Sequence, residues 1–160
     1  MIKDMDDNHY LQMAITRSRQ SVQEGRFAAG AVIVADYLGE PPTFGAVSGN
    51  GLSDFRHAET RAIEGAIEQV QRNLTGAVLY ASMEPCLMCM TMIYWSGVRR
   101  VVYAIRQSKV DSSYYESDVI TTADLARALH ETIKLVHVPE LEGIALDVVR
   151  EWEQTKVQGA

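Results

Sequence analysis

Apolar side chains recur along the chain with two different periods, and the way these periods alternate predicts the elements. Apolar residues spaced by three or four positions indicate amphipathic helices, whereas short runs rich in Val and Ile indicate buried strands. The predicted helices are residues 6–24, 57–71, 86–97, 121–131 and 141–156. The predicted strands are residues 28–36, 44–50, 77–82, 100–105 and 133–138. Strands that alternate with helices imply a sheet covered by helices on both faces.

Residues that start or stop elements support this division. Pro41 and Pro42 cannot donate ladder hydrogen bonds, so the segment between the first two strands is predicted to be the turn of a hairpin. Gly97 is a plausible end for the third helix. Thr121 and Asp124 have the spacing of a capping box, although Asp replaces the preferred Glu.

Between the fourth strand and the fourth helix lies a polar segment, residues 106–120, which is the longest irregular stretch. Irregular segments of this length are often functional. No internal repeat, low-complexity tract or Gly/Ser-rich linker divides the chain, so residues 1–160 are expected to form one domain.

Composition limits the class of protein. The apolar content is 47% and the charged content 22%, as in an average globular protein. No run of about 20 apolar residues is present, which argues against a membrane helix. The first ten residues, MIKDMDDNHY, lack the layout of a secretory signal, so a cytoplasmic protein is expected. The formal net charge of −6 argues against nucleic acid as the main partner.

The only two cysteines, Cys86 and Cys89, are three positions apart at the start of a predicted helix. With Pro85 in the first turn, both thiols would share one face near the helix N-terminus, where the helix dipole favours thiolate. In a reducing compartment such a pair binds a metal or acts in redox chemistry. The cysteine spacing alone leaves both possibilities open.

His57 and Glu59 stand at the start of another predicted helix. A histidine added to two thiolates gives three metal ligands, and three protein ligands with one open position are the catalytic arrangement for zinc. Glu59 would lie close to the metal without being a ligand, where a carboxylate can take a proton from the metal's water. A closed structural site is not indicated, because the other histidines lack the spacing of zinc fingers. These are His9, His130 and His137.

The order H-x-E followed by P-C-x-x-C is the signature of zinc nucleobase deaminases. With GAVIV, HAE, EPCLMC and RRVVYA as anchors, residues 9–120 resemble the cytidine deaminase-like superfamily, and most of all its guanine deaminase and tRNA adenosine deaminase branch. The resemblance implies an α/β fold, a three-layer α/β/α sandwich around a five-stranded mixed sheet, and a homodimer. It also implies that His57, Cys86 and Cys89 bind Zn²⁺ and that Glu59 shuttles protons.

The chain departs from this family where the base would bind. Ala28 and Ala29 replace the usual Pro-Phe before Gly-Ala-Val, so a ring that often lines the base pocket is missing. An Asn at the end of the second strand usually binds the base, and Asn50 is the candidate here. Ala58, inside the HAE motif, is a further candidate for substrate binding.

Two other residues suggest guanine. MIYWSGVRRVVYA looks like the guanine deaminase branch, which makes Trp95 a candidate pocket wall, although a core position would also explain it. Glu116 follows two tyrosines in SYYESD, and its carboxylate could accept the N1–H and 2-amino donors of guanine. A solvated loop position is the alternative for Glu116. The predicted reaction is hydrolytic deamination of a small free base, guanine or a close analogue.

Three alternatives remain. The first is a cytosine or nucleoside deaminase. The second is a tRNA adenosine deaminase, which needs phosphate contacts, and the only local basic cluster is Arg99, Arg100, Arg106 and Lys109. The third is a non-catalytic zinc or redox interaction module, which would gain nothing from Glu59 beside the metal.

Overall fold

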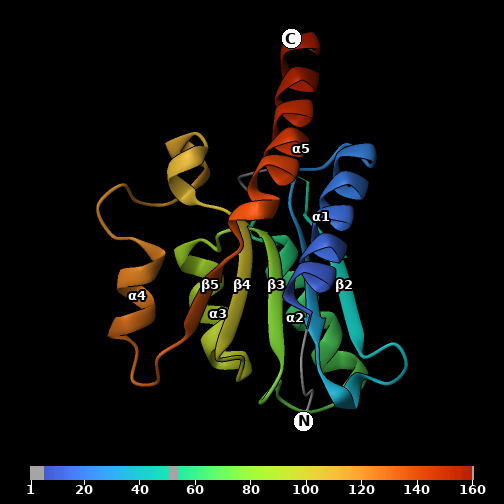
Figure 1. Ribbon diagram of the computed structural model, residues 1–160, viewed down its shortest axis with the longest axis vertical. Coiled ribbons are helices and arrows are strands. Elements are labelled where there is room, and N and C mark those ends of the chain that lie inside the picture. The colour runs from blue at the N-terminus through green and yellow to red at the C-terminus, as the bar shows by residue number, and fades with distance from the viewer. Residues whose placement is uncertain (1–5, 51–53, 160) are drawn as a thin grey trace.

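The computed structural model describes residues 6–50 and 54–159, and its framework is a five-stranded mixed sheet (Figure 1). The strands are β1 (Gly30–Val34), β2 (Thr43–Val47), β3 (Val78–Met83), β4 (Arg100–Ile105) and β5 (Lys134–His137). Their order in the sheet is β2-β1-β3-β4-β5. β1 runs antiparallel to both β2 and β3, whereas β3, β4 and β5 are parallel. The predicted hairpin of the first two strands is therefore confirmed.

Helices cover both faces of this sheet, as Figure 1 shows. The helices are α1 (Asp7–Gln23), α2 (Ala58–Val70), α3 (Leu87–Ser96), α4 (Thr122–Ala128) and α5 (Pro139–Gln158). α1 and α5 pack together on one face, and α2 and α3 pack together on the other, with α4 beside α3 and β5. This arrangement confirms the predicted three-layer α/β/α sandwich.

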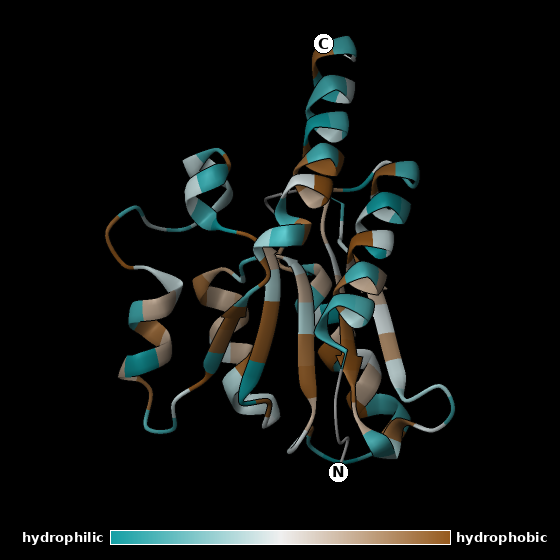
Figure 2. Cartoon of the chain, in the orientation of Figure 1, coloured by the Kyte–Doolittle hydropathy of each residue, from teal (hydrophilic) through white to brown (hydrophobic). Residues whose placement is uncertain are grey.

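The burial of the chain follows its hydropathy, with apolar strands inside and polar helix surfaces outside (Figure 2). β1 and β3 are buried along their whole length, as expected for strands with a helix layer on each side. None of the described helices is long and apolar enough to cross a lipid bilayer.

Several predicted ends of helices are confirmed, because the residues at these positions determine them locally. Gly97 ends α3 in the left-handed conformation, with a φ of 95°. Thr121 and Asp124 form the predicted capping box at the start of α4. The predicted irregular segment 106–120 contains only short 3₁₀ helices, η2 (Gln107–Lys109) and η3 (Ser112–Tyr114). A third, η1 (Asp36–Leu38), lies in the hairpin turn.

The first helix contacts the sheet at unusually short range. A Cβ atom added to Gly30 on β1 would lie 2.3 Å from the carbonyl oxygen of Ala14 and 2.4 Å from the backbone nitrogen of Ser18. Both atoms belong to the backbone of α1 and cannot rotate away. The position of α1 therefore depends on the missing side chain of Gly30.

Replacement of Gly30 by Ala is expected to destabilise the protein by about 1–3 kcal/mol or more, because the new methyl group forces α1 away from β1. Urea unfolding followed by circular dichroism measures this loss. Gly143→Ala in α5 is the matched control, since a Cβ there meets no other atom within 4 Å. The control should be neutral or slightly stabilising. Equal unfolding midpoints for wild type and Gly30→Ala would contradict the packing of α1 described above.

Candidate active site

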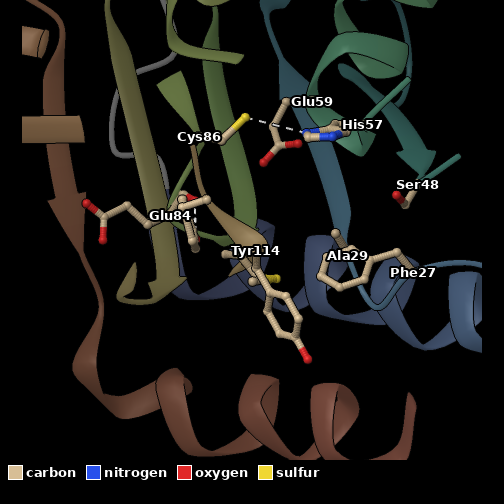
Figure 3. A pocket seen from close by; sticks show the side chains of 10 residues that line it. Phe27, Ala29, Ser48, His57, Glu59, Glu84, Cys86 and Tyr114 are labelled. Carbon is tan, nitrogen blue, oxygen red and sulfur yellow. Dashed lines mark hydrogen bonds between the residues drawn. The ribbon is translucent and has the colours of Figure 1, made fainter. Parts of the chain in front are cut away.

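Two helix N-termini meet beside the sheet and bring three potential metal ligands together. His57 is the N-cap of α2, Cys86 is the N-cap of α3, and Cys89 lies in the first turn of α3. The Nδ1 atom of His57 lies 3.5 Å from the Sγ atom of each cysteine. Figure 3 shows the side chains of His57 and Cys86 pointing toward each other. The sequence placed Pro85 in the first turn of this helix, but the helix begins at Leu87, so Cys86 caps it.

The spacing of these atoms fits zinc. A tetrahedral ion with Zn–S near 2.3 Å and Zn–N near 2.0 Å would hold nitrogen and sulfur about 3.5 Å apart. In the described part of the chain, His57, Cys86 and Cys89 are the only cluster of three or more such side chains with their ligand atoms within 4.8 Å of one another. The set therefore offers three ligands and leaves a fourth position for water or substrate.

The ligands polarise one another. A hydrogen bond from Cys89, together with His57, lowers the pKa of the Cys86 thiol to about 6. The bond to Cys86 raises the pKa of His57 to about 9, and Cys86 and burial hold the pKa of Cys89 well above its usual range. The lowered pKa favours the thiolate of Cys86, the form in which cysteine binds a metal. Metal binding must then displace protons from His57 and Cys89.

Glu59, at the second position of α2, is almost completely buried, with 6% of its surface exposed. Its Oε2 atom lies 3.6 Å from the Sγ atom of Cys89. Burial, and next the negative charge of Cys86, raise the pKa of Glu59 to about 7. A carboxyl group with this pKa both accepts and donates a proton near neutral pH.

Glu59, His57 and Cys86 line a small cavity, here called the inner cavity, of about 30 Å³. Its lining residues are Phe27, Ala29, Ser48, His57, Glu59, Met83, Glu84, Cys86, Tyr114 and Tyr115. Figure 3 shows the rings of Phe27 and Tyr114 across the cavity from Glu59, His57 and Cys86, and the carboxylate of Glu84 pointing away from them.

A larger hollow of about 360 Å³, here called the outer hollow, shares four lining residues with the inner cavity. The shared residues are His57, Cys86, Tyr114 and Tyr115. The outer hollow is further lined by Asp54, Phe55, Met88, Ser113 and Glu116. His57 and Cys86 therefore face the outer hollow as well as the inner cavity.

A buried hydroxyl supports one wall of the inner cavity. Ser21 on α1 donates to the carbonyl oxygen of Phe27 at 2.5 Å and accepts from the backbone nitrogen of Ser48 at 3.2 Å. This bridge fixes the end of β2 against the segment that precedes β1. α1 can approach β1 closely because Gly30 has no side chain. The position of α1 therefore also determines the position of this wall.

Two of the predicted substrate-binding residues, Asn50 and Ala58, lie after β2 and at the start of α2. Asn50 is exposed, its side-chain oxygen accepts from Arg26 at 3.3 Å, and it does not line the inner cavity. β2 ends at Val47, and Ser48 lines the cavity in its place. Ala58 is fully buried as the first residue of α2, between His57 and Glu59.

The structure does not place Trp95 in the pocket of its own chain. Trp95 is 82% exposed, because it follows the buried Ile93 by two positions and so points to the opposite side of α3. It is neither a core residue nor a wall of the inner cavity.

Glu116 borders the outer hollow, but its carboxylate has another function. Its two oxygens accept from the backbone nitrogens of Leu87 and Met88 at 3.0 and 2.8 Å. These bonds hold the pKa of Glu116 below its usual value in spite of its partial burial. Glu116 therefore caps α3, and its role as an acceptor for guanine stays a prediction.

Sequence reasoning missed most of the cavity wall. Phe27 supplies an aromatic ring three positions before Gly30, although the ring usual in the family is absent at Ala29. The pair of tyrosines at 114–115 was visible as the one aromatic feature in the irregular segment. Ser48 carries no signal in the sequence.

The part of the chain that carries these potential ligands resembles known proteins. Residues 4–105 match the family model described as the cytidine and deoxycytidylate deaminase zinc-binding region. A probable cytosine deaminase of Schizosaccharomyces pombe is 39% identical over 102 residues, 62% of this chain and 60% of that protein. The match therefore spans less than two thirds of that relative.

Two guanine deaminases are also similar. The enzyme of Bacillus subtilis is 30% identical over 125 residues, 72% of this chain and 75% of that protein. The structure of guanine deaminase from Nitrosomonas europaea superimposes with a TM-score of 0.73, covering 95% of this chain and 86% of that chain at 18% identity. At this identity the superposition shows the fold.

The ligand set predicts the metal content of variants. The wild-type protein should bind about one zinc ion per chain, and His57→Ala or Cys89→Ser should lose most of it, since two ligands bind zinc far more weakly than three. Elemental analysis of dialysed protein measures this. Glu59→Gln is the matched control and should keep its zinc. Full zinc content in both ligand variants would contradict this ligand set.

Proposed function

The chain belongs to the cytidine and deoxycytidylate deaminase family, and from this premise we propose that it is a zinc-dependent hydrolase that removes an amino group from a small free nucleobase. The observation that carries the proposal is the buried carboxyl group of Glu59 beside the three ligands, facing the inner cavity. A redox or structural centre would not need such a group. The arrangement is that of an acid–base catalyst beside an open metal position.

His57, Cys86 and Cys89 would hold the zinc ion, which when bound acidifies its water and so supplies a nucleophile at neutral pH. Glu59 takes a proton from the attacking water and delivers it to the ring nitrogen next to the carbon that bears the amine. The oxygen adds to this carbon as the ring nitrogen takes up that proton. Glu59 then takes the remaining proton of the added hydroxyl and passes it to the amino group, which leaves as ammonia as the C–N bond breaks and the C=O bond forms. The products are the corresponding oxo base and ammonia.

The proposed substrate is a small molecule, because the basic residues that would bind a phosphate backbone are engaged elsewhere. Arg99 pairs with Glu131, Arg100 with Asp7 and Arg106 with Glu142, each at 2.7–2.8 Å. These ion pairs neutralise three members of the basic cluster. Such a surface gives little attraction for tRNA.

Guanine and cytosine are the two candidate bases. Guanine is the sequence-based prediction, and it needs Glu116 to accept two donors from the base while it caps α3. Cytosine is favoured by the 39% identity to a probable cytosine deaminase and requires no such acceptor. Both candidates use Glu59 and the ligands in the same way.

Exposed apolar side chains on α3 support the homodimer predicted from the family. Met92 and Trp95, three positions apart on one face of this helix, are 39% and 82% exposed. Large exposed apolar side chains close to one another are typical of protein interfaces.

Ammonia release from the zinc-loaded protein is the direct test of the reaction. A panel of guanine, cytosine, adenine and their nucleosides should show release from at least one free base. Glu59→Gln should lower kcat at least about 1,000-fold, because it removes the only proton carrier proposed at the site. It should keep its zinc and its fold. Full turnover in Glu59→Gln, or release from no base or nucleoside, would contradict the proposal.

The variant Glu116→Gln distinguishes guanine from cytosine as the substrate. If Glu116 accepts donors from guanine, the variant should lose about 100-fold or more in kcat/KM for guanine and little for cytosine. If Glu116 acts only as the cap of α3, the two values should fall together, with a loss of about 1 kcal/mol in unfolding free energy. Asp118→Asn, two residues further along the same exposed segment, is the control for loss of charge.

A further inference from the structure

β2 is an edge strand of the sheet, beside α1 and α2 (Figure 1). It pairs with β1 on one side, and no strand in residues 6–50 and 54–159 pairs with its other side. Ala35 donates to the carbonyl oxygen of Pro42 at 3.0 Å, and Ser48 donates to that of Ala29 at 3.2 Å, so Pro42 and Ser48 face β1. Backbone groups alternate in direction along a strand. The residues whose N–H and C=O groups point away from the sheet are therefore Thr43, Gly45 and Val47.

This open edge lacks the usual protection within the strand itself. Edge strands commonly carry a charged side chain, a proline or a bulge that keeps other strands away. Residues 43–47 read TFGAV, and they pair with β1 one to one, without a bulge. Among the outward backbone groups, only the carbonyl oxygen of Val47 has a partner in the described part of the chain, because it accepts from Arg61 at 3.0 Å. The groups of Thr43 and Gly45 can therefore pair with an added strand.

Two arginines flank the open edge, one from each face of the sheet. Arg17 comes from α1 and lies over Gly45, where an added Cβ atom would be 2.7 Å from the Nε atom of Arg17. Arg61 comes from α2, on the opposite face, and donates to the carbonyl oxygens of Val47 and Ser48, each at 3.0 Å. Both arginines line one hollow of about 330 Å³ beside β2. A positive charge therefore stands on each side of the edge.

These arginines use only part of their capacity to donate. Arg17 donates from NH1 to the side-chain oxygen of Gln20 at 3.0 Å, and Arg61 also donates only from NH1 to groups in the described part of the chain. Glu24 lines the same hollow, but its carboxylate accepts from Gln20 at 2.9 Å and pairs with Arg26 at 3.3 Å. The hollow therefore presents uncompensated positive charge next to unpaired backbone groups.

We propose that the open edge of β2 binds an extended segment of a partner protein that carries two consecutive acidic residues. The segment adds a strand to the sheet, and its backbone pairs with the outward groups of Thr43 and Gly45. Side chains of a strand alternate between the two faces of a sheet. An acidic side chain opposite Gly45 therefore meets Arg17 on the face of α1, and its neighbour meets Arg61 on the face of α2. The proposal does not rest on the proposed function.

Charge and hydrogen bonding both favour this occupant over two others. If two copies of this chain paired their β2 edges about a twofold axis, the Arg17 side chains would come together, and like charges across a strand pair are destabilising. An inorganic anion would face the outward carbonyl oxygen of Gly45, which needs a donor. An acidic peptide strand supplies carboxylates to the arginines and N–H groups to the carbonyl oxygens.

Fluorescence anisotropy with the full chain and a labelled peptide, Val-Thr-Asp-Glu-Val-Thr, tests the proposal. The peptide should bind saturably, and the peptide with Asn-Gln in place of Asp-Glu should bind about 10-fold more weakly, because two exposed ion pairs are lost. Two further peptides keep the acidic side chains but are N-methylated at alternate residues, one at each alternate set. Strand addition predicts that one of the two loses binding and the other keeps it, because only one edge of the peptide faces β2.

Variants of the protein test the two charges. Arg17→Gln and Arg61→Gln should each weaken the acidic peptide about 3- to 5-fold and change the affinity for the Asn-Gln peptide little. Arg17→Gln is the cleaner variant, since Arg61 also holds the carbonyl oxygen of Ser48. Arg19→Gln is the matched control, because Arg19 is exposed on α1 and does not line the hollow, and it should bind like wild type.

Three results would overturn the proposal. The first is no binding of the acidic peptide at millimolar concentration. The second is equal binding of both N-methylated peptides, which would mean attraction by charge without strand pairing. The third is unchanged affinity in both Arg17→Gln and Arg61→Gln. If the arginines only keep copies of this chain apart, the acidic peptide will not bind, and Arg17→Gln will self-associate in analytical ultracentrifugation.

Discussion

The direction of β2 is the constraint on which the site depends. β2 and β3 both run antiparallel to β1, so they point the same way, and the helices that follow them begin at the same end of the sheet. α2 and α3 therefore bring their N-termini together, with His57 and Cys86 as the two N-caps. Without the hairpin of β1 and β2, the histidine and the cysteines would lie at opposite ends of the sheet.

Two converging helix N-termini also determine the electrostatics of the site. Each N-terminus carries unpaired backbone N–H groups and a partial positive charge, which favour anions. The thiolate of Cys86 and the carboxylate of Glu116 both lie at the start of α3. Glu59 is different, because its burial outweighs this favourable field and leaves its carboxyl group ready to exchange protons near neutral pH. The same framework thus brings together three potential metal ligands and a carboxyl group that can exchange protons.

The sequence predicted the fold and the clustering of the three potential ligands well, because both depend on local patterns. The periodicities predicted the five strands and five helices found in residues 6–50 and 54–159, and the motif residues His57, Cys86 and Cys89 meet as expected. The structure gives less support to the predicted substrate-binding residues. Asn50 and Trp95 lie outside the inner cavity, since the ends of β2 and the rotation of α3 depend on packing that no motif records.

The substrate base is harder to predict than the reaction, because different parts of the chain determine the two. The family match ends at residue 105, and every ligand and Glu59 precede this point. Two residues of the cavity wall contact residues that are far away in the sequence. Tyr114 contacts Glu153, and Phe27 contacts Trp152. Spacing along the sequence cannot encode contacts of this kind, because they form only when α5 packs against α1. The three potential metal ligands and Glu59 therefore lie in the first 105 residues, whereas Tyr114 and Tyr115 of the cavity wall come from the segment that follows.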